Sequence, residues 1–131
     1  PLLTTISLIS PAIAMGNRVI LIPSESFPSV ALELVQTFET SDIPPGVINI
    51  VTGDKDELSN QLVGHAEVDG VWCWADSDTI AKVETTSALD LKRLWIHSDG
   101  DRDWLDPNQG EGLEFLRNAT EVKNIWTPYG D

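Results

Sequence analysis

The chain has 131 residues, a length typical of a single domain, and 41% of its residues are apolar and 22% charged, as in ordinary globular proteins. Its 8 Lys and Arg against 21 Asp and Glu give a net charge of −13. This charge excludes nucleic acid and an anionic membrane as expected partners, because both require a positive surface. The single cysteine, Cys73, excludes an internal disulfide and any multi-cysteine metal site.

The opening segment, residues 2–15, is apolar but is interrupted by threonine, serine and proline residues. It is shorter than the roughly 20 residues that cross a bilayer, and it lacks the basic flank of a signal peptide. We therefore expect a buried helix, no membrane span and a cytoplasmic protein. A doubly wound sheet that starts with a helix lacks its first strand, so we expect a fragment of a larger protein.

Four short runs rich in β-branched or aromatic residues are predicted strands: residues 19–22, 47–51, 71–74 and 94–96. Each run is almost continuously apolar, which is typical of strands covered on both faces in a parallel sheet. The intervening segments have helical patterns. Pro28 suits a first helical turn, Asp54 suits the cap of the next helix, and Asp76 or Ser77 suits the cap of a third.

Strand–helix alternation with short connections predicts an α/β fold. We expect a partial doubly wound, Rossmann-like parallel sheet in a three-layer αβα arrangement over residues 1–98. Residues 99–131 form a second segment, with an acidic loop, a helix around 112–119 and a last apolar run at 122–126 that predicts a strand. Such a strand would pair with another subunit, with Trp104, Trp126 and Tyr129 either as interface anchors or as ordinary packing residues.

Sequence patterns for catalysis are weak. Cys73 lies inside an apolar run where burial favours a structural thiol over a nucleophile, so we predict no catalytic residue. Neither histidine, His65 or His97, has metal-ligand spacing. The aspartates at 99, 101 and 103 match the start of a calcium loop, but Trp104 and Gly110 stand where its glycine and glutamate belong, so we predict no metal site.

Neither common phosphate-binding glycine motif occurs in the chain. The remaining places for a phosphate are the helix N-termini that follow residues 23–25, Gly53 and residues 75–76. The last of these is unfavourable, because Asp76 and Asp78 place two carboxylates there.

Five further motifs follow one another along the chain: P-L-L at 1–3, P-A-I-A-M-G-N at 11–17, I-P-S-E at 22–25, P-P-G-V-I-N-I-V-T-G at 44–53 and H-A-E-V-D-G-V at 65–71. In order and spacing they resemble N-F-P-L, P-A-L-A-x-G-N, K-P-S-E, P-P-G-V-x-N-V-V-x-G and H-P-x-V-D-x-I of the aldehyde dehydrogenase superfamily. The resemblance covers the cofactor-binding domain of that family and extends to about residue 93.

The resemblance implies an NAD(P) site, because the lysine and glutamate of K-P-S-E hold the adenine ribose in the family. Glu25 would bind the ribose here, with Ser24 and Gly53 beside it, and a carboxylate at that place favours NAD over NADP. Ile22 stands at the lysine position, however, and an aliphatic side chain cannot donate a hydrogen bond. The exchange removes a charge-assisted contact of about 1.5–3 kcal/mol.

Other family positions also differ. The F-T-G-S turn against the pyrophosphate reads C-W-A-D at 73–76, so Asp76 would repel the anion. Ile80 replaces a helical glycine, and His97 stands at the general-base glutamate of L-E-L-G-G-K. Residues 104–130 resemble the tail of the two-module family-sixteen aldehyde dehydrogenases, whose C-terminal module lacks the nucleophile.

These observations favour one hypothesis and leave a second open. In the first, the chain is a degenerate, non-catalytic cofactor-binding and structural module of an NAD(P)-dependent aldehyde dehydrogenase that converts aldehydes to acids. It would associate as a homo-oligomer or with the rest of its parent protein. In the second, it is an interaction module that oligomerises through its C-terminal strand.

Overall fold

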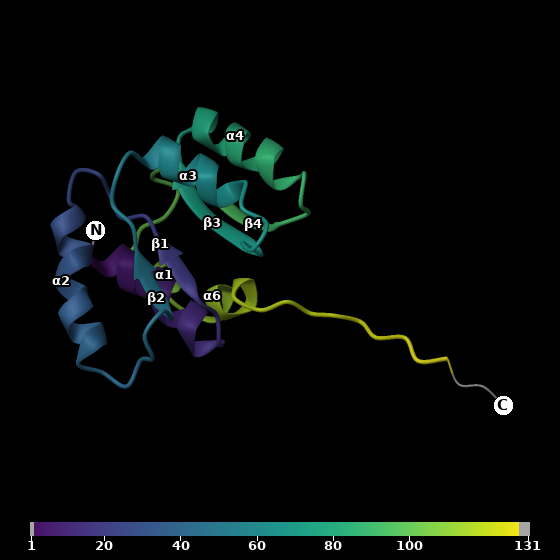
Figure 1. The fold of residues 1–131 in the computed structure, drawn as a ribbon, viewed down its shortest axis with the longest axis horizontal. Coiled ribbons are helices and arrows are strands. Elements are labelled where there is room, and N and C mark those ends of the chain that lie inside the picture. Colours follow the sequence, from purple (N-terminus) through teal and green to yellow (C-terminus); the bar gives the residue numbers. More distant parts are fainter. Residues whose placement is uncertain (1, 129–131) are drawn as a thin grey trace.

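The computed structural model describes residues 2–128, and in it helices and strands alternate (Figure 1). The elements are α1 (Leu2–Ala14), β1 (Val19–Leu21), α2 (Pro28–Glu39), β2 (Ile48–Ile50), α3 (Lys55–Val63), β3 (Gly70–Ala75), α4 (Ser77–Ser87), β4 (Arg93–Ser98), α5 (Pro107–Gly110) and α6 (Leu113–Asn118). All four predicted strands are present, and the predicted α/β class is confirmed.

The strands form two separate parallel pairs. β1 pairs with β2 in the register Ile20↔Asn49, and β3 pairs with β4 in the register Trp72↔Trp95. No ladder joins the two pairs in the described part of the chain. Helices α1 and α2 pack on the first pair, whereas α4 packs on the second pair and on α3.

Local sequence explains where the helices begin. The Asp54 carboxylate accepts a hydrogen bond from the Glu57 N–H (2.8 Å) and caps α3. The Asp76 carboxylate accepts from the N–H groups of Asp78 and Thr79 and caps α4. Pro28 opens α2, as predicted, because its fixed φ suits a first helical turn.

Burial is lower than the apolar runs predicted. The first helix buries only Thr5, Ile9 and Ala12, and Leu2 is 47% exposed. Within the strands, Ile20 is 46% exposed, which contradicts coverage on both faces. Each pair has only two strands and therefore two open edges, so the strand side chains lack the flanking neighbours of a full sheet.

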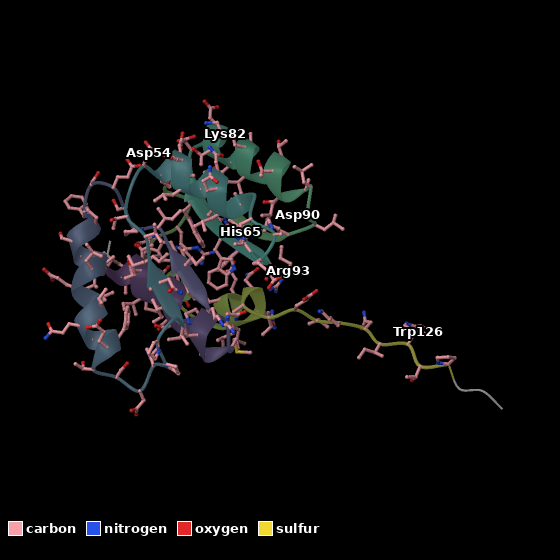
Figure 2. All side chains as sticks on the ribbon, in the orientation of Figure 1. Asp54, His65, Lys82, Asp90, Arg93 and Trp126 are labelled. Carbon is pink, nitrogen blue, oxygen red and sulfur yellow. The ribbon has the colours of Figure 1, made fainter. Side chains whose placement is uncertain are left out.

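The C-terminal segment contains the predicted helix but not the predicted strand. Gly112 and Ala119 flank α6 as its caps, and α6 packs on α1. Residues 121–128 have no regular structure, because no strand of the described chain lies beside them. Figure 2 shows Trp126 on this extension, away from the body of the molecule. Tyr129 lies outside the described residues, and the boundary at residue 98 stays a prediction.

No helix described between residues 2 and 128 is long and apolar enough to cross a membrane.

Candidate functional site

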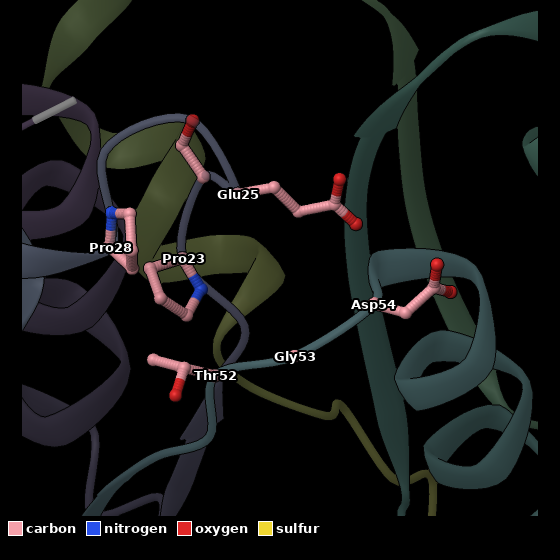
Figure 3. A pocket seen from close by; sticks show the side chains of 7 residues that line it. Pro23, Glu25, Pro28, Thr52, Gly53 and Asp54 are labelled. Atoms are coloured by element: carbon pink, nitrogen blue, oxygen red, sulfur yellow. The ribbon is translucent and has the colours of Figure 1, made fainter.

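The three predicted cofactor-binding residues meet at one pocket. Ser24 and Glu25 follow β1 and Gly53 follows β2, so both loops lie where parallel strands end. The pocket has a volume of about 370 Å³ and is lined by these three residues with Pro23, Pro28, Thr52 and Asp54 (Figure 3). The ends of parallel strands are the usual ligand edge of a doubly wound sheet.

The Glu25 carboxylate already has a partner inside the chain. Its Oε1 accepts a hydrogen bond from the backbone N–H of Lys55, the first residue of α3. Figure 3 shows the Glu25 side chain extending toward the α3 side of the pocket. The carboxylates of Glu25 and Asp54 therefore both occupy the N-terminus of α3. An incoming phosphate would need free N–H groups at this place.

Gly53 is required by the backbone at this turn. Its φ is +158°, and a Cβ placed there would lie 3.3 Å from Cδ1 of Leu58 in α3. A side chain would therefore press on the first turns of the helix that follows.

The N-terminus of α4 is occupied in the same way. Oδ1 of Asp76 lies 3.0 Å from the Asp78 nitrogen and 2.9 Å from the Thr79 nitrogen. These bonds, the Thr79 bond first, lower the pKa of Asp76 below its ordinary value and favour its charged form. The helix dipole is therefore already matched by a carboxylate of the chain itself.

Lys55 is a site residue that the sequence analysis missed. Its Nζ donates to the carbonyl of Trp74 at the end of β3, over 3.1 Å, while its N–H binds Glu25. Lys55 thus links the ends of β1 and β3. The only available sequence signal was its position after the cap residue Asp54, and this position does not reveal a partner 19 residues away.

Cys73 lies in β3 near this edge. Burial raises the pKa of its thiol, and the charges of Asp99 and Asp76 act in the same direction, while Lys55 opposes them. A thiol with a raised pKa is a poor nucleophile at neutral pH, and the absence of a catalytic residue stays a prediction.

Known proteins match much of this chain. A family model described as the aldehyde dehydrogenase family matches residues 1–104. The chain belongs to the aldehyde dehydrogenase family.

Individual members of the family support the match. Betaine aldehyde dehydrogenase of Vibrio vulnificus (strain CMCP6) is 36% identical over 118 residues, which cover 90% of this chain and 24% of that protein. The NADP/NAD-dependent aldehyde dehydrogenase PuuC of Escherichia coli (strain K12) is 36% identical over 102 residues, covering 76% of this chain and 20% of that protein. This chain therefore spans about a quarter or less of these relatives.

Solved structures of the family share the fold. A mutant of aldehyde dehydrogenase C from Pseudomonas syringae, in complex with NAD+ and octanal, superposes with a TM-score of 0.68 at 31% identity. The match covers 73% of this chain and 20% of that one. The Rossmann-like class predicted from the sequence is thereby confirmed. The likeness of residues 104–130 to family-sixteen tails stays a prediction.

His97, which the resemblance would place at the family's general-base glutamate, stacks on Trp74 with ring centroids 5.5 Å apart. Nε2 of His97 and Nε1 of Trp74 are buried, and neither has a hydrogen-bond partner in the described chain.

The acidic loop at residues 99–103 is where the sequence came nearest to a metal-binding pattern. Between residues 2 and 128 no group of three or more metal-binding side chains comes together. Asp101 instead accepts the N–H of Ser98, and Asp103 accepts the N–H of Leu105. Asp101 and Asp103 therefore accept hydrogen bonds from nearby backbone N–H groups.

Ring contacts assign Trp104 to ordinary packing. It lies 5.2 Å from Trp74 and 6.3 Å from Phe115, centroid to centroid. The Arg102 guanidinium lies 5.2 Å from the centroids of Trp95 and Phe115 and makes two-pronged hydrogen bonds to Glu114. The acidic sequence of this segment predicts only a loop and gives no sign of the role of Arg102.

Proposed function

We propose that this chain is a non-catalytic structural module of an aldehyde dehydrogenase, in which the dinucleotide groove no longer holds its cofactor. The parent protein would oxidise aldehydes to acids with NAD(P), in a cytoplasmic homo-oligomer. One observation carries the proposal: carboxylates of the chain occupy the N-termini of both α3 and α4, through Glu25, Asp54 and Asp76. A pyrophosphate would have to displace like charges to reach these N–H groups.

The residues fit only the ribose half of the cofactor. Ser24, Glu25 and Gly53 surround the pocket in which the family resemblance would place the adenine ribose. The phosphate half does not fit, because Ile22 replaces the lysine and Asp76 stands in the turn. We therefore expect weak recognition of an adenosine group at most, with NAD preferred over NADP.

Calorimetric titration of the folded chain with NAD, NADP and adenosine tests the proposal. We expect no saturable heat from either dinucleotide up to about millimolar concentration, which corresponds to about 4 kcal/mol of binding free energy. Binding of NAD in the micromolar range would contradict the proposal and identify a working cofactor domain.

The double variant Ile22→Lys with Asp76→Ser tests the cause. If Ile22 and Asp76 are what prevents binding, the double variant should bind NAD at least tenfold more tightly than the parent chain, a gain of about 1.4 kcal/mol. The matched control, Leu32→Lys with Asp42→Ser, makes the same charge changes at exposed positions away from the pocket and should leave the affinity unchanged. An equal gain in both would assign the effect to net charge.

The extended tail favours a second candidate function, association with another protein. Val122, Ile125 and Trp126 are 88%, 86% and 93% exposed, an unusual share of apolar surface for one short segment. Light scattering of the full chain and of a chain ending at Thr120 would compare their masses. A monomer in both cases would contradict tail-mediated association.

A further inference from the structure

The chain contains two Asp-Gly pairs, Asp69-Gly70 and Asp99-Gly100. Asp-Gly is the dipeptide in which an aspartate side chain reacts most readily with the backbone, because glycine has no Cβ to hinder the approach of its nitrogen to the aspartate Cγ. All four residues are exposed to solvent, so exposure does not distinguish the two pairs. Their backbones differ in conformation and in hydrogen bonding.

The pair Asp69-Gly70 is fixed by the pairing of β3 with β4. The Asp69 carbonyl accepts a hydrogen bond from the Arg93 N–H (3.1 Å) at the start of β4. Gly70 is the first residue of β3 and pairs with Arg93, and a Cβ placed on Gly70 would lie 3.5 Å from the Arg93 carbonyl oxygen. Rotation of the peptide between Asp69 and Gly70 would therefore break a ladder hydrogen bond.

The pair Asp99-Gly100 lies in a turn directly after β4. The Asp101 N–H donates to the Ser98 carbonyl (3.2 Å), so Asp99 and Gly100 are the two central residues of a four-residue turn. Gly100 has a φ of +90°, a left-handed conformation that favours glycine. Apart from its chain neighbours, no atom of the described chain lies within 4 Å of the position that a Cβ would take. The turn is therefore open around the Gly100 nitrogen.

Hydrogen bonds hold the two ends of this turn but not its centre. The Asp99 N–H donates to the Ala75 carbonyl (3.0 Å), and Oδ2 of Asp101 accepts from the Ser98 N–H (3.0 Å). The Asp99 carbonyl and the Gly100 N–H form the central peptide, and neither has a hydrogen-bond partner within the described chain. The central peptide can therefore rotate without loss of the bonds on either side of it.

We propose that Asp99 is a modification site, at which the chain converts aspartate into isoaspartate through a cyclic succinimide. The Gly100 nitrogen attacks Cγ of Asp99 and a C–N bond forms, while the bond from Cγ to its hydroxyl breaks and the hydroxyl leaves as water with the amide proton. Addition of one water then opens the ring at either carbonyl. Opening at the Asp99 backbone carbonyl leaves Cγ in the main chain and frees the α-carboxyl, so the product has the mass of the starting chain.

Isoaspartate lengthens the main chain of the turn by one methylene. Ser98 is the last residue of β4, and Arg102 follows the turn with a side chain that is 8% exposed and lies against the rings of Trp95 and Phe115. A longer turn would shift Asp101 away from the Ser98 N–H, and Arg102 is the next residue along the chain. The modification should therefore loosen the packing around Arg102.

Peptide mapping of the aged chain tests the site. The folded chain is incubated for several weeks at about pH 5, where part of the aspartate carboxyls is protonated and able to lose water. Trypsin then places the two Asp-Gly pairs in separate peptides, residues 56–82 and 94–102, and electron-transfer fragmentation distinguishes isoaspartate from aspartate at equal mass. We expect at least about tenfold more isoaspartate at Asp99 than at Asp69, because Asp69 reacts only after local opening of the strand pair.

The same chain in guanidinium chloride is the matched control. Unfolding removes both the turn and the strand pair, so the two Asp-Gly pairs should then form isoaspartate at rates within about threefold of each other. A second control is Asp99→Glu, which keeps the charge but would have to form a less favourable six-membered ring. With an isoaspartyl carboxyl methyltransferase and labelled S-adenosylmethionine, which methylate the freed α-carboxyl, aged Asp99→Glu should accept at least about fivefold fewer methyl groups than the aged parent.

Three outcomes would overturn the proposal: equal isoaspartate at Asp69 and Asp99 in the folded chain, a larger share at any other aspartate, or equal methylation of the aged parent and aged Asp99→Glu. A tenfold difference that persisted in guanidinium chloride would also overturn it, because the flanking sequence and not the turn would then be the cause. This inference goes beyond the proposed function. The reaction uses only groups of the turn, so a positive cofactor titration would leave it untouched and the two proposals can fail separately.

Discussion

The two strand pairs of this chain differ in how they relate to the rest of the family. The β1–β2 half retains the family motifs at 22–25 and 44–53 and contains the small pocket, yet its strands have only three residues each. The β3–β4 half departs from the family at 73–76, and its strands have six residues each. The half that least resembles the family is the half with the longer ladder.

The second half packs through its aromatic side chains. Trp74 contacts Trp95, His97 and Trp104, and Trp95 contacts Trp72 and Phe115, with ring centroids between 4.8 and 5.5 Å apart. We call the group of Trp74, Trp95, Trp104, Phe115 and Arg102 the aromatic cluster. Aromatic pairs of this geometry contribute about 0.5–1.5 kcal/mol each beyond their area burial.

The residues that match the family motifs are therefore not the residues expected to contribute most to stability. The family motifs at 22–25 and 44–53 lie in the β1–β2 half, whereas the largest fully buried side chain, Phe115, belongs to the aromatic cluster. The residues that the resemblance would place at the family's pyrophosphate turn include Ala75, which is buried, and Trp74, which packs in the aromatic cluster. Substitutions in the two halves should therefore have very different effects on stability.

The largest difference is expected for phenylalanine truncation. Phe115→Ala removes a side chain that is 1% exposed and should lower the free energy of unfolding in urea by about 3–5 kcal/mol. Its matched control, Phe27→Ala, removes a side chain that is 57% exposed and should change it by less than about 0.5 kcal/mol. Equal losses would contradict the assignment of stability to the aromatic cluster.

Arg102→Lys should have the next largest effect. The Arg102 side chain is 8% exposed and makes two-pronged hydrogen bonds to Glu114 between the rings of the cluster. Lysine keeps the charge but has no planar fork, so we expect a loss of about 2 kcal/mol in unfolding free energy. Arg18→Lys, at an exposed position outside the cluster, is the control. A neutral Arg102→Lys would show that charge alone suffices.

Local features of this fold could be predicted from the sequence. The strands at 19–21 and 70–75 and the caps Asp54 and Asp76 depend on neighbouring residues, and the pocket of Ser24, Glu25 and Gly53 follows from where strands end. These predictions required only periodicity, capping chemistry and the family resemblance.

Features that depend on distant partners could not be predicted. Arg102 is surrounded by rings from β3, β4 and α6, and Lys55 joins the ends of two strands, so neither role is visible in flanking residues. The same limit applies to the strand at 122–126, which was expected to pair with another subunit and stays a prediction. An apolar run forms a strand only if another edge pairs with it, and none in the described chain does.

The smallest effect on stability is expected at the solvent-exposed cap Asp76, and this effect should depend on pH. Its folded-state pKa lies below the ordinary 3.8, chiefly because of the hydrogen bond from Thr79. Such a carboxyl contributes stability above its unfolded pKa and loses that contribution as pH falls through the folded value. Asp76→Ala should therefore be less stable than the parent chain near neutral pH, and the gap should close below pH 3.8.

Urea midpoints of the two chains, measured from about pH 6 down to about pH 2.5, follow this gap. The control Asp42→Ala removes an exposed aspartate away from any helix N-terminus. Its difference in stability from the parent chain should not close at low pH. If the gap between Asp76→Ala and the parent stayed constant to the lowest pH, the charged cap would not stabilise α4. The N-terminus of α4 would then be open to an anion after all, and the strongest argument against a phosphate at this edge would be lost.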